Sequence, residues 1–342
     1  IQASLVGSEM CIRDRWKPSR NSYLSNYYLM RLMMDAGLPD GVINFIPGKA
    51  SMIGDICLSH PMLAGIHFTG STSVFRQMWK DVANNLANLR SYPRIVGETG
   101  GKDFIVAHPN CDQKALTVAL IRGAFEYQGQ KCSAASRAYI PESVWNAIKA
   151  DYVNEVSKIS VGDPKDFSNF MGAVIDRKSF DNIAGYIDRA NRDSGCEIVT
   201  GGEYDDSTGY FVQPTTIVCS DPNYETMAEE IFGPVLSIYV YPDHEFIETL
   251  DLCDNTSEYA LTGSIFAANR EDIEVAMAAL RYSAGNFYIN DKPTGAVVGQ
   301  QPFGGARGSG TNDKAGSPLN LLRWVSPRSV SYTHLRAHET CL

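Results

Sequence analysis

The chain has 342 residues, which is long enough for two domains of ordinary size, each with a core of its own. Hydrophobic residues make up 44% and charged residues 20%, and no uninterrupted apolar run is long enough to span a bilayer, so the composition predicts a soluble globular protein without a membrane partner. A net charge of −9 without a block of Lys and Arg argues against nucleic acid and favours small molecules as partners.

The cysteines show neither a CxxC pair nor the spacing of metal ligands. We therefore predict no metal site and a reducing compartment. The eight residues are Cys11, Cys57, Cys111, Cys132, Cys196, Cys219, Cys253 and Cys341.

The first 15 residues have neither the apolar run nor the cleavage site of a signal peptide, and we expect them to be a non-native extension. From Trp16 onward, apolar residues recur at helical spacing until GLPDG at 37–41, which supplies the Gly and Pro that end a helix. The segment 42–48 then has the composition of a short strand closed by Pro-Gly.

Two further strands are expected at 65–69 and 94–98. They flank a helical segment that either Ser71 or Thr72 can cap. The alternation of strand, helix and strand predicts a parallel, doubly wound sheet, as in nucleotide-binding domains.

A second α/β unit follows, with strands expected at 103–108 and 137–140 around a helix at 114–127. Further α/β segments continue to about Pro293. The glycine-rich segment 294–318 is expected to be loop, with its backbone close to another part of the protein.

The stretch FEYQGQKCSAASR at 125–137 holds the first candidate catalytic residue. Cys132 follows a helix on a glycine-containing turn, and the small residues after it leave room for a substrate. Lys131 and the turn amides would lower the pKa of the thiol and make it a nucleophile. A buried structural cysteine is the alternative. A Cys/His hydrolase has little support, because no histidine is evidently placed beside Cys132.

The segment GETGGKD at 97–103 holds the second candidate. Glu98 ends a strand, and two glycines follow it after Thr99. A carboxylate in this place acts as a general base if burial raises its pKa toward neutrality. The alternative is a glutamate that faces solvent at the end of a strand.

Six motifs taken together resemble the aldehyde dehydrogenase superfamily, in that family's order and separations. The resemblance extends from Trp16 to near Ser331. It implies an α/β fold in which a Rossmann-type NAD-binding part precedes an α/β catalytic domain. The motifs are WKPS (16–19), FTGS (68–71), GETGGKD (97–103), GQKCSAASR (129–137), EEIFGPV (229–235) and PFGG (302–305).

The resemblance also implies a division of the chain. It places a partial NAD-binding domain at 16–98, a catalytic domain at 99–293, and a substrate-anchor loop with an oligomerisation tail at 294–330. Residues 331–342 lack periodicity, like 1–15, and are expected to be a second non-native extension.

In such an enzyme, Cys132 would add to the aldehyde carbonyl, and Glu98 would activate the water that hydrolyses the resulting thioester. The backbone amide of Cys132 would hold the developing oxyanion. The cofactor would be NAD. Its expected contacts are Lys17 at the adenosine ribose, Ser71 near the pyrophosphate, and Glu230 and Phe232 at the nicotinamide ribose and ring.

The segment 285–314 is similar to the branch of this family that oxidises L-glutamate γ-semialdehyde, the open form of 1-pyrroline-5-carboxylate, to L-glutamate in proline catabolism. There, Ser133 and the backbone at Gly295 and Ala296 would hold the α-carboxylate of the substrate, and Phe303 would pack against its aliphatic chain. Another carboxylated semialdehyde is the alternative substrate.

Two departures from the family pattern bear on these expectations. Arg20 stands where the family often has an acidic residue that disfavours NADP, so NAD is predicted and NADP stays open. The family's first nucleotide-binding strand and its oxyanion-hole asparagine, which lie before WKPS, have no counterpart here. We therefore expect a fragment of a longer enzyme, with an inactive binding or scaffold protein as the alternative.

Partners and location follow from the resemblance alone. A homo-oligomer is expected for the full-length protein, with 319–330 as a candidate tail for joining subunits. Eukaryotic members of the branch work in the mitochondrial matrix, so that location is expected here, or the cytoplasm if the source is bacterial.

Overall fold

A computed structural model of the chain describes residues 14–297 and 299–330. These residues form two compact units. The first unit comprises 14–66, 80–95 and 318–330, and the second comprises 67–79 and 96–317. None of the helices in these ranges is both long and apolar enough to cross a membrane.

The first unit contains a short parallel pair of strands, β1 (Asp14–Trp16) and β2 (Ile43–Phe45). Helix α1 (Tyr23–Asp35) follows the 3-10 turn η2 (Arg20–Ser22) and ends just before GLPDG, as predicted. Neither α1 nor α2 (Ala50–Ser59) has a buried residue.

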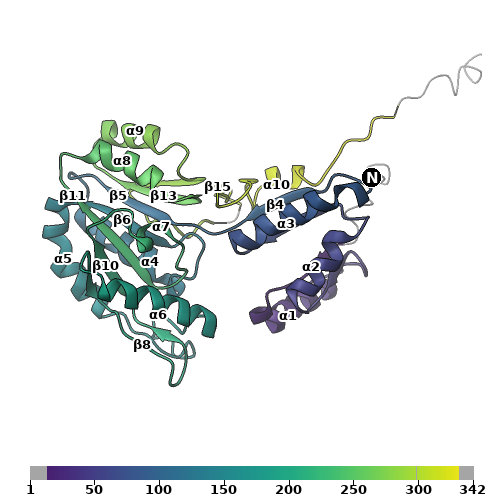
Figure 1. Cartoon of the computed structure of the whole chain (residues 1–342), viewed down its shortest axis with the longest axis horizontal. Coiled ribbons are helices and arrows are strands. Elements are labelled where there is room, and N and C mark those ends of the chain that lie inside the picture. Colours follow the sequence, from purple (N-terminus) through teal and green to yellow (C-terminus); the bar gives the residue numbers. More distant parts are fainter. Residues whose placement is uncertain (1–13, 298, 331–342) are drawn as a thin grey trace, which may run out of the picture. The chain divides into compact units, whose positions relative to one another are not determined.

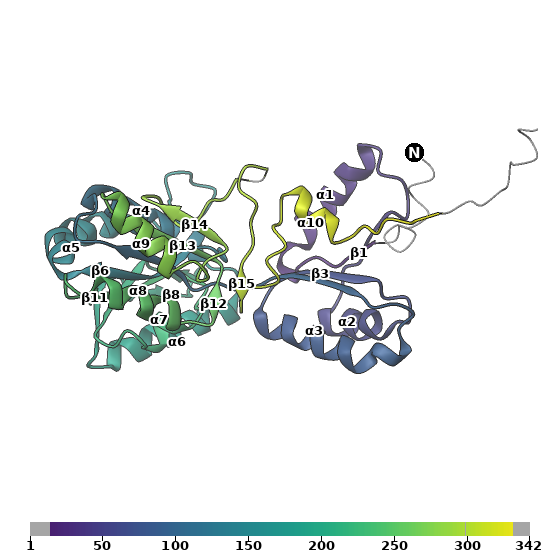
Figure 2. The ribbon, with the colours of Figure 1, turned by 90° about the horizontal axis from the view of Figure 1, so that it is seen from above.

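Three elements run from one unit into the other. Strands β3 (Gly65–Thr69) and β4 (Arg94–Glu98) have the predicted bounds and pair in a two-stranded sheet, and α3 (Thr72–Asn85) lies between them in sequence. Within the first unit, the ends of α2 and α3 meet where Asn85 Nδ2 donates to Leu58 O at 3.2 Å (Figure 2). Of the doubly wound parallel sheet expected for this part, the described residues form two separate pairs, because no described strand joins β1–β2 to β3–β4.

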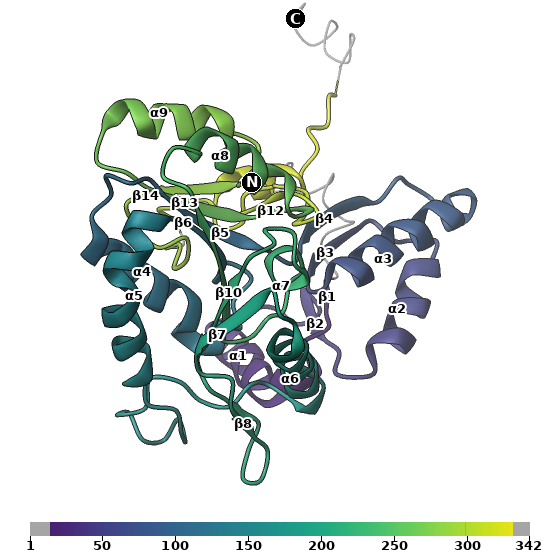
Figure 3. The same cartoon turned by 60° about the vertical axis from the view of Figure 1, so that its left-hand side comes forward.

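The second unit is built on a seven-stranded sheet in the order β14-β13-β5-β6-β11-β10-β7 (Figure 3). Neighbouring strands are parallel except at β7, which pairs with β10 in the antiparallel sense. The strands are β5 (Asp103–Ala107), β6 (Ala135–Pro141), β7 (Cys196–Thr200), β10 (Thr215–Cys219), β11 (Val235–Tyr241), β13 (Thr262–Phe266) and β14 (Asn286–Ile289).

Helices cover both faces of this sheet (Figure 1). On β5, Phe104 and Val106 belong to one apolar cluster, while Ile105 and Ala107 belong to the other. Because both faces are buried, the strand is apolar from Phe104 to Ala107 rather than alternating. The first cluster includes α6 (Arg177–Arg192), α8 (Phe246–Asn255) and α9 (Arg270–Ala279), and the second includes α4 (Gln113–Phe125) and α5 (Glu142–Ser157).

The remaining elements of both units are short. They are the 3-10 turns η3 (Leu86–Asn88) and η4 (Glu126–Gly129), the helices α7 (Glu225–Ala228) and α10 (Pro318–Leu322), and the strands β8 (Tyr204–Asp205), β9 (Phe211–Val212), β12 (Tyr259–Ala260) and β15 (Ala306–Arg307).

The glycine-rich segment 294–318 is mostly loop, but β15 within it pairs with β12 and its last residue, Pro318, begins α10, so the expectation of loop alone is wrong at these positions. The predicted close backbone approach is confirmed. Gly310 has φ +136°, and a Cβ on it would lie 2.2 Å from Gly97 O. Thr311 N also donates to Gly97 O at 2.9 Å, so this loop lies against the end of β4.

The same contacts set the division of the chain. Residues 96–98 and the start of α3 belong to the second unit, where Thr72 Oγ1 donates to Gly308 O at 3.3 Å. Residues 318–330 belong to the first unit instead. The compact units therefore differ from the division of 16–98, 99–293 and 294–330 expected from the sequence, which stays an interpretation. The extensions expected at 1–15 and 331–342 lie outside the described residues, apart from residues 14 and 15.

Candidate active site

The glutamate predicted as a base ends β4 in a buried environment. Glu98 bridges to Gly310 of the glycine-rich loop, and the neighbouring Thr99 N donates to Ser309 O at 2.8 Å. The Oε1 atom of Glu98 is buried and has no hydrogen-bond partner in the described structure. Burial raises the pKa of Glu98 to about 7, against a smaller opposing effect of the Lys314 ammonium. The side chain therefore has the pKa of a general base at neutral pH.

Two glycines bring the Glu98 segment against the candidate nucleophile. A Cβ on Gly101 would lie 2.3 Å from Cys132 O, and a Cβ on Gly100 would lie 2.2 Å from Glu230 Oε2. Any side chain at these positions would push the segments apart. Because Gly100 and Gly101 have no side chains, the segments that carry Glu98, Cys132 and Glu230 pack together, although they come from three distant parts of the sequence.

The turn before Cys132 has an unusual backbone. Tyr127, Gln128 and Gly129 all have positive φ, at 55°, 57° and 62°. Such strain persists only where the surroundings hold it, and it is commonest at functional sites. Here Gln130 Nε2 donates to Ser179 Oγ at 2.8 Å, and Gln130 Oε1 accepts from Ile175 N at 2.9 Å. These bonds fix the loop that carries the thiol.

The sequence-based expectation of a lowered pKa for the Cys132 thiol is wrong. Burial, together with the smaller effect of the carboxylates Asp103, Glu98 and Glu230, raises the pKa of Cys132 to about 12. Lys131 does not offset this, because its Nζ lies 3.1 Å from Glu126 Oε2. The thiol therefore needs a base to remove its proton.

Glu126 forms ion pairs with three cations. Its carboxylate lies 2.6 Å from Arg122 Nε, 3.1 Å from Lys131 Nζ and 2.9 Å from Lys292 Nζ. Burial alone would raise the pKa of Glu126, but the bonds from Lys292 and Lys131 outweigh it and lower that pKa to about 2. One carboxylate thus connects α4, the turn before Cys132 and the segment that leads to Gly295.

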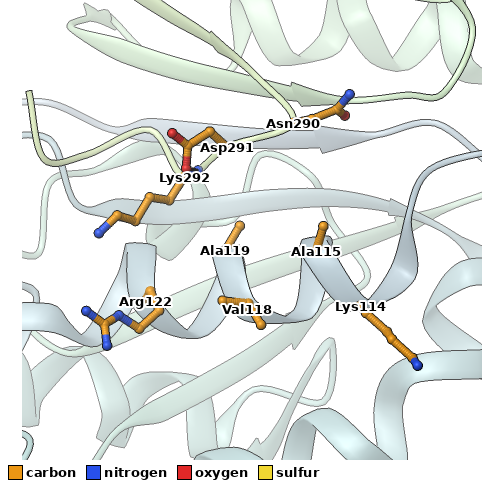
Figure 4. Close-up of a pocket in the computed structure, with 8 residues that line it drawn as sticks. All are labelled: Lys114, Ala115, Val118, Ala119, Arg122, Asn290, Asp291 and Lys292. Carbon is orange, nitrogen blue, oxygen red and sulfur yellow. Dashed lines mark hydrogen bonds between the residues drawn. The ribbon is translucent and has the colours of Figure 1, made fainter.

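A pocket of about 500 Å³ lies beside this cluster, between α4 and the residues after β14 (Figure 4). Arg122 and Lys292 both line it. None of the predicted site residues does, so the pocket is separate from the position of the thiol. Its full lining is Lys114, Ala115, Val118, Ala119, Arg122, Asn290, Asp291 and Lys292.

A buried group of charges under the site was missed by the sequence reasoning. Lys102, Asp103 and Arg137 are each about 1% exposed. Burial lowers the pKa of Lys102 to about 7 and raises that of Asp103 to about 8. Arg137 Nε donates to Lys102 O at 2.8 Å. The available signal was a Lys-Asp pair at the start of a run of apolar residues typical of a buried strand.

The residues predicted for the nicotinamide half of NAD fit that role. Glu230 Oε1 accepts from Gly101 N at 3.0 Å, which fixes the position of the carboxylate. Phe232 has φ 60° and is 41% exposed, so its ring is free to contact a planar group. Ser71 is exposed directly before α3, and the start of a helix suits a pyrophosphate.

The predicted adenosine contacts lie in the first unit. Lys17 is half-buried and its Nζ donates to Pro18 O at 2.6 Å. Arg20 is exposed at the start of η2.

Two of the predicted substrate contacts are joined by Thr294. Ser133 is 7% exposed, and its Oγ lies 2.8 Å from Thr294 Oγ1, the residue before Gly295. Gly295 is exposed with φ +94°, a conformation that favours glycine. The loop that carries the thiol therefore touches the loop predicted to anchor the substrate.

The other two predicted substrate contacts are also on this glycine-rich segment. Ala296 is half-buried directly after Gly295. Phe303 is half-buried too, and its backbone N donates to Ala315 O at 2.9 Å. No group of three or more potential metal ligands occurs among the described residues.

Comparison with known proteins places this arrangement in a family. A profile described as the aldehyde dehydrogenase family matches residues 15–330. The delta-1-pyrroline-5-carboxylate dehydrogenase, mitochondrial, of Dictyostelium discoideum is 55% identical over 317 residues, which cover 92% of this chain and 57% of that protein. The human protein of the same name is 49% identical over 320 residues, covering 93% of this chain and 57% of that protein.

A solved structure shows the same fold. The crystal structure of the delta-pyrroline-5-carboxylate dehydrogenase from Mycobacterium tuberculosis bound with NAD aligns with a TM-score of 0.87 and 50% sequence identity. The alignment covers 96% of this chain and 61% of that one. The chain thus spans about three fifths of the length of the relatives it matches, and the expected aldehyde dehydrogenase-like fold is confirmed.

Proposed function

Since the chain belongs to the aldehyde dehydrogenase family, we propose that the protein containing it oxidises L-glutamate γ-semialdehyde to L-glutamate, with NAD as cofactor, in proline catabolism. The observation that carries this proposal is the packing of Gly100 and Gly101 against Glu230 and the Cys132 carbonyl. That packing supplies a nucleophile, a base and a ribose acceptor in one place.

The chemistry begins at the thiol. Cys132 gives its proton to a base, and its sulfur bonds to the aldehyde carbon to form a thiohemiacetal. Glu98, with a pKa near 7, is suited to accept this proton. The backbone amide of Cys132 stabilises the oxyanion because its dipole is fixed before the reaction.

NAD, when bound, accepts the hydride from the thiohemiacetal carbon. The thioester that remains on Cys132 is then hydrolysed. Glu98 removes a proton from water, the water oxygen bonds to the carbonyl carbon, and the carbon–sulfur bond breaks. The products are a carboxylic acid and the free thiol. Glu230 and Phe232 would contact the nicotinamide end of NAD and Ser71 its pyrophosphate, and Lys17, in the first unit, is the expected contact of the adenosine ribose.

Substrate choice depends on the segment from Thr294 to Phe303. Backbone amides at Gly295 and Ala296, together with the Ser133 hydroxyl, can converge on an α-carboxylate without a paired cation. The Ser133–Thr294 contact supports this role, because it ties the anchor to the loop that carries the nucleophile.

The test is a rate comparison on the natural full-length protein that contains this chain. We expect NAD reduction with L-glutamate γ-semialdehyde, a much lower kcat/KM with succinate semialdehyde, and loss of activity in Cys132→Ala. Equal rates with the two substrates would favour another carboxylated semialdehyde. A higher kcat/KM with NADP would overturn the cofactor assignment and point to Arg20.

An inactive scaffold is the second candidate, and the raised thiol pKa favours it for the chain without ligands. A thiol that stays unreactive toward an aldehyde-mimicking reagent in the presence of NAD would support the scaffold. We also propose a mitochondrial matrix location, since several relatives are named mitochondrial. A homo-oligomer is proposed from the family resemblance alone. Fractionation of source cells and sedimentation of the full-length protein test these two points.

A further inference from the structure

Two cysteines lie opposite each other at the edge of the seven-stranded sheet. Cys196 is the first residue of β7 and Cys219 is the last residue of β10, and the two are direct partners in the antiparallel register. Their Sγ atoms are 4.0 Å apart. Both are free thiols in the structure.

The type of pairing brings these side chains close. Ser220 N donates to Gly195 O at 2.8 Å, so the neighbouring pair is a hydrogen-bonded one. Hydrogen-bonded and non-hydrogen-bonded pairs alternate along antiparallel strands, and Cys196 and Cys219 therefore form a non-hydrogen-bonded pair. In such pairs the Cα atoms are typically about 4.5 Å apart, which lies within the range of about 4.4–6.8 Å that disulfides require.

We propose that Cys196 and Cys219 form a reversible cross-strand disulfide when the protein meets a hydroperoxide. Cys219 is 2% exposed whereas Cys196 is only half-buried, so the oxidant reaches Cys196 first. To bond, the sulfurs must approach each other by about 2 Å, a change within reach of side-chain rotation on a fixed backbone.

The reaction balances with one hydroperoxide. The Cys196 sulfur attacks a peroxide oxygen, the O–O bond breaks, and a sulfenic acid and an alcohol or water form. The Cys219 sulfur then displaces hydroxide from the Cys196 sulfur, and the hydroxide leaves as water with the thiol proton. Two thiols lose two protons and two electrons in total, and the peroxide gains them. A dithiol reductant reverses the bond.

The surroundings set the rate of this modification. Burial raises the pKa of both thiols, that of Cys219 to about 12, so the thiolates that react are scarce at neutral pH. Formation is therefore slow at pH 7 and faster at pH 9. The bond would close a loop over residues 196–219 at the sheet edge, and it does not depend on the proposed catalytic function.

The test uses the whole chain treated with hydrogen peroxide and then alkylated. No Lys or Arg lies between residues 193 and 269, so trypsin leaves both cysteines in one peptide. A glutamate-specific protease separates them, because Glu197 and Glu203 lie between them. We expect mass spectrometry to find the two resulting peptides linked, and the linkage to disappear after dithiothreitol treatment.

Thermal unfolding gives an independent readout. Oxidation is expected to raise the Tm by about 5 °C, since a loop of this size is closed in the unfolded chain. The rise should vanish in Cys196→Ser and Cys219→Ser and persist in Cys253→Ser, which removes a buried thiol of α8. Oxidation of Cys132 shows that the peroxide treatment was sufficient. If Cys196 and Cys219 are then recovered without a bond between them, or bonded to other cysteines, the proposal is overturned.

Discussion

At the scale of single residues, the site depends on a carboxylate whose burial disfavours its charged form. Glu98 has a buried oxygen without a partner and a pKa of about 7, against an ordinary value of 4.5. Folding therefore favours the protonated form. The charged form costs stability progressively as the pH rises from 4.5 through about 7, and the full cost is present above that range.

We expect Glu98→Gln to be more stable than the unmodified chain at pH 8 and nearly equal to it at pH 5. The neutral amide removes the cost of burying the charge, which is at most about 3 kcal/mol and is reduced by partial exposure. Urea denaturation at the two pH values measures this difference. A loss of stability at pH 8 would mean that the carboxylate has a favourable partner.

The same variant tests the role of Glu98 as a base. In the full-length protein, the rate of the glutamate-forming reaction should rise with pH through about 7 and level off above it, because the carboxylate is the active form. Glu98→Gln should lower kcat by about a hundredfold or more and remove this rise. If the rate of the Glu98→Gln variant still rises with pH through about 7, the base is another group.

The nucleophile carries a separate prediction. With its pKa at about 12, Cys132 should react with iodoacetamide about tenfold faster for each unit of pH between 7 and 10. Trypsin releases the reporting peptide at 132–137, since Lys131 and Arg137 flank it. A rate that levels off near pH 8 would show that the thiol pKa is lowered, as the sequence-based reasoning expected.

At the scale of elements, Glu126 joins three segments through ion pairs. Its pKa of about 2 means that the carboxylate stabilises the fold above pH 4.5, and that this contribution is lost as the pH falls from 4.5 toward 2. We expect Glu126→Gln to lower the free energy of unfolding by about 1–2 kcal/mol at pH 7, because Arg122, Lys131 and Lys292 lose their shared acceptor.

Glu155→Gln is the matched control. Glu155 pairs with Lys158 at 2.6 Å on an exposed surface, and such pairs contribute from nothing to about 1 kcal/mol. Urea denaturation of both variants at pH 7 makes the comparison. Equal losses would show that the cluster around Glu126 contributes no more than a surface ion pair.

The elements also show what the sequence could predict. The bounds of β3 and β4 were predictable because β-rich runs end at glycine or a charged residue. Cys132 and Glu98 could be proposed from motifs, and their packing through Gly101 gives a physical reason for the GG pair. The role of Lys131 could not be predicted, because its ion pair with Glu126 belongs to a cluster that Lys292, distant in sequence, joins only in three dimensions.

At the scale of the whole molecule, the two units differ in how much they bury. The core clusters of the second unit include nearly all its strands and long helices. In the first unit, α1 and α2 contain no buried residue, and Leu24, Tyr28 and Ile56 are each more than 60% exposed. Exposed apolar surface of this kind marks either an interaction surface or a segment of low local stability.

We therefore expect limited trypsin digestion of this chain to cut first at Arg31 and Lys49, which are exposed in α1 and directly before α2. Lys114 and Lys178 are the internal controls, since they are equally exposed side chains on α4 and α6, whose other faces are buried in the core. Mass spectrometry of the early fragments identifies the cuts. Because a protease needs several residues of unfolded backbone, the order of cutting reports the stability of each helix rather than the exposure of its side chains. Early cuts at Lys114 or Lys178 would show that α4 and α6 open as easily as α1, and that burial in the second unit does not set local stability.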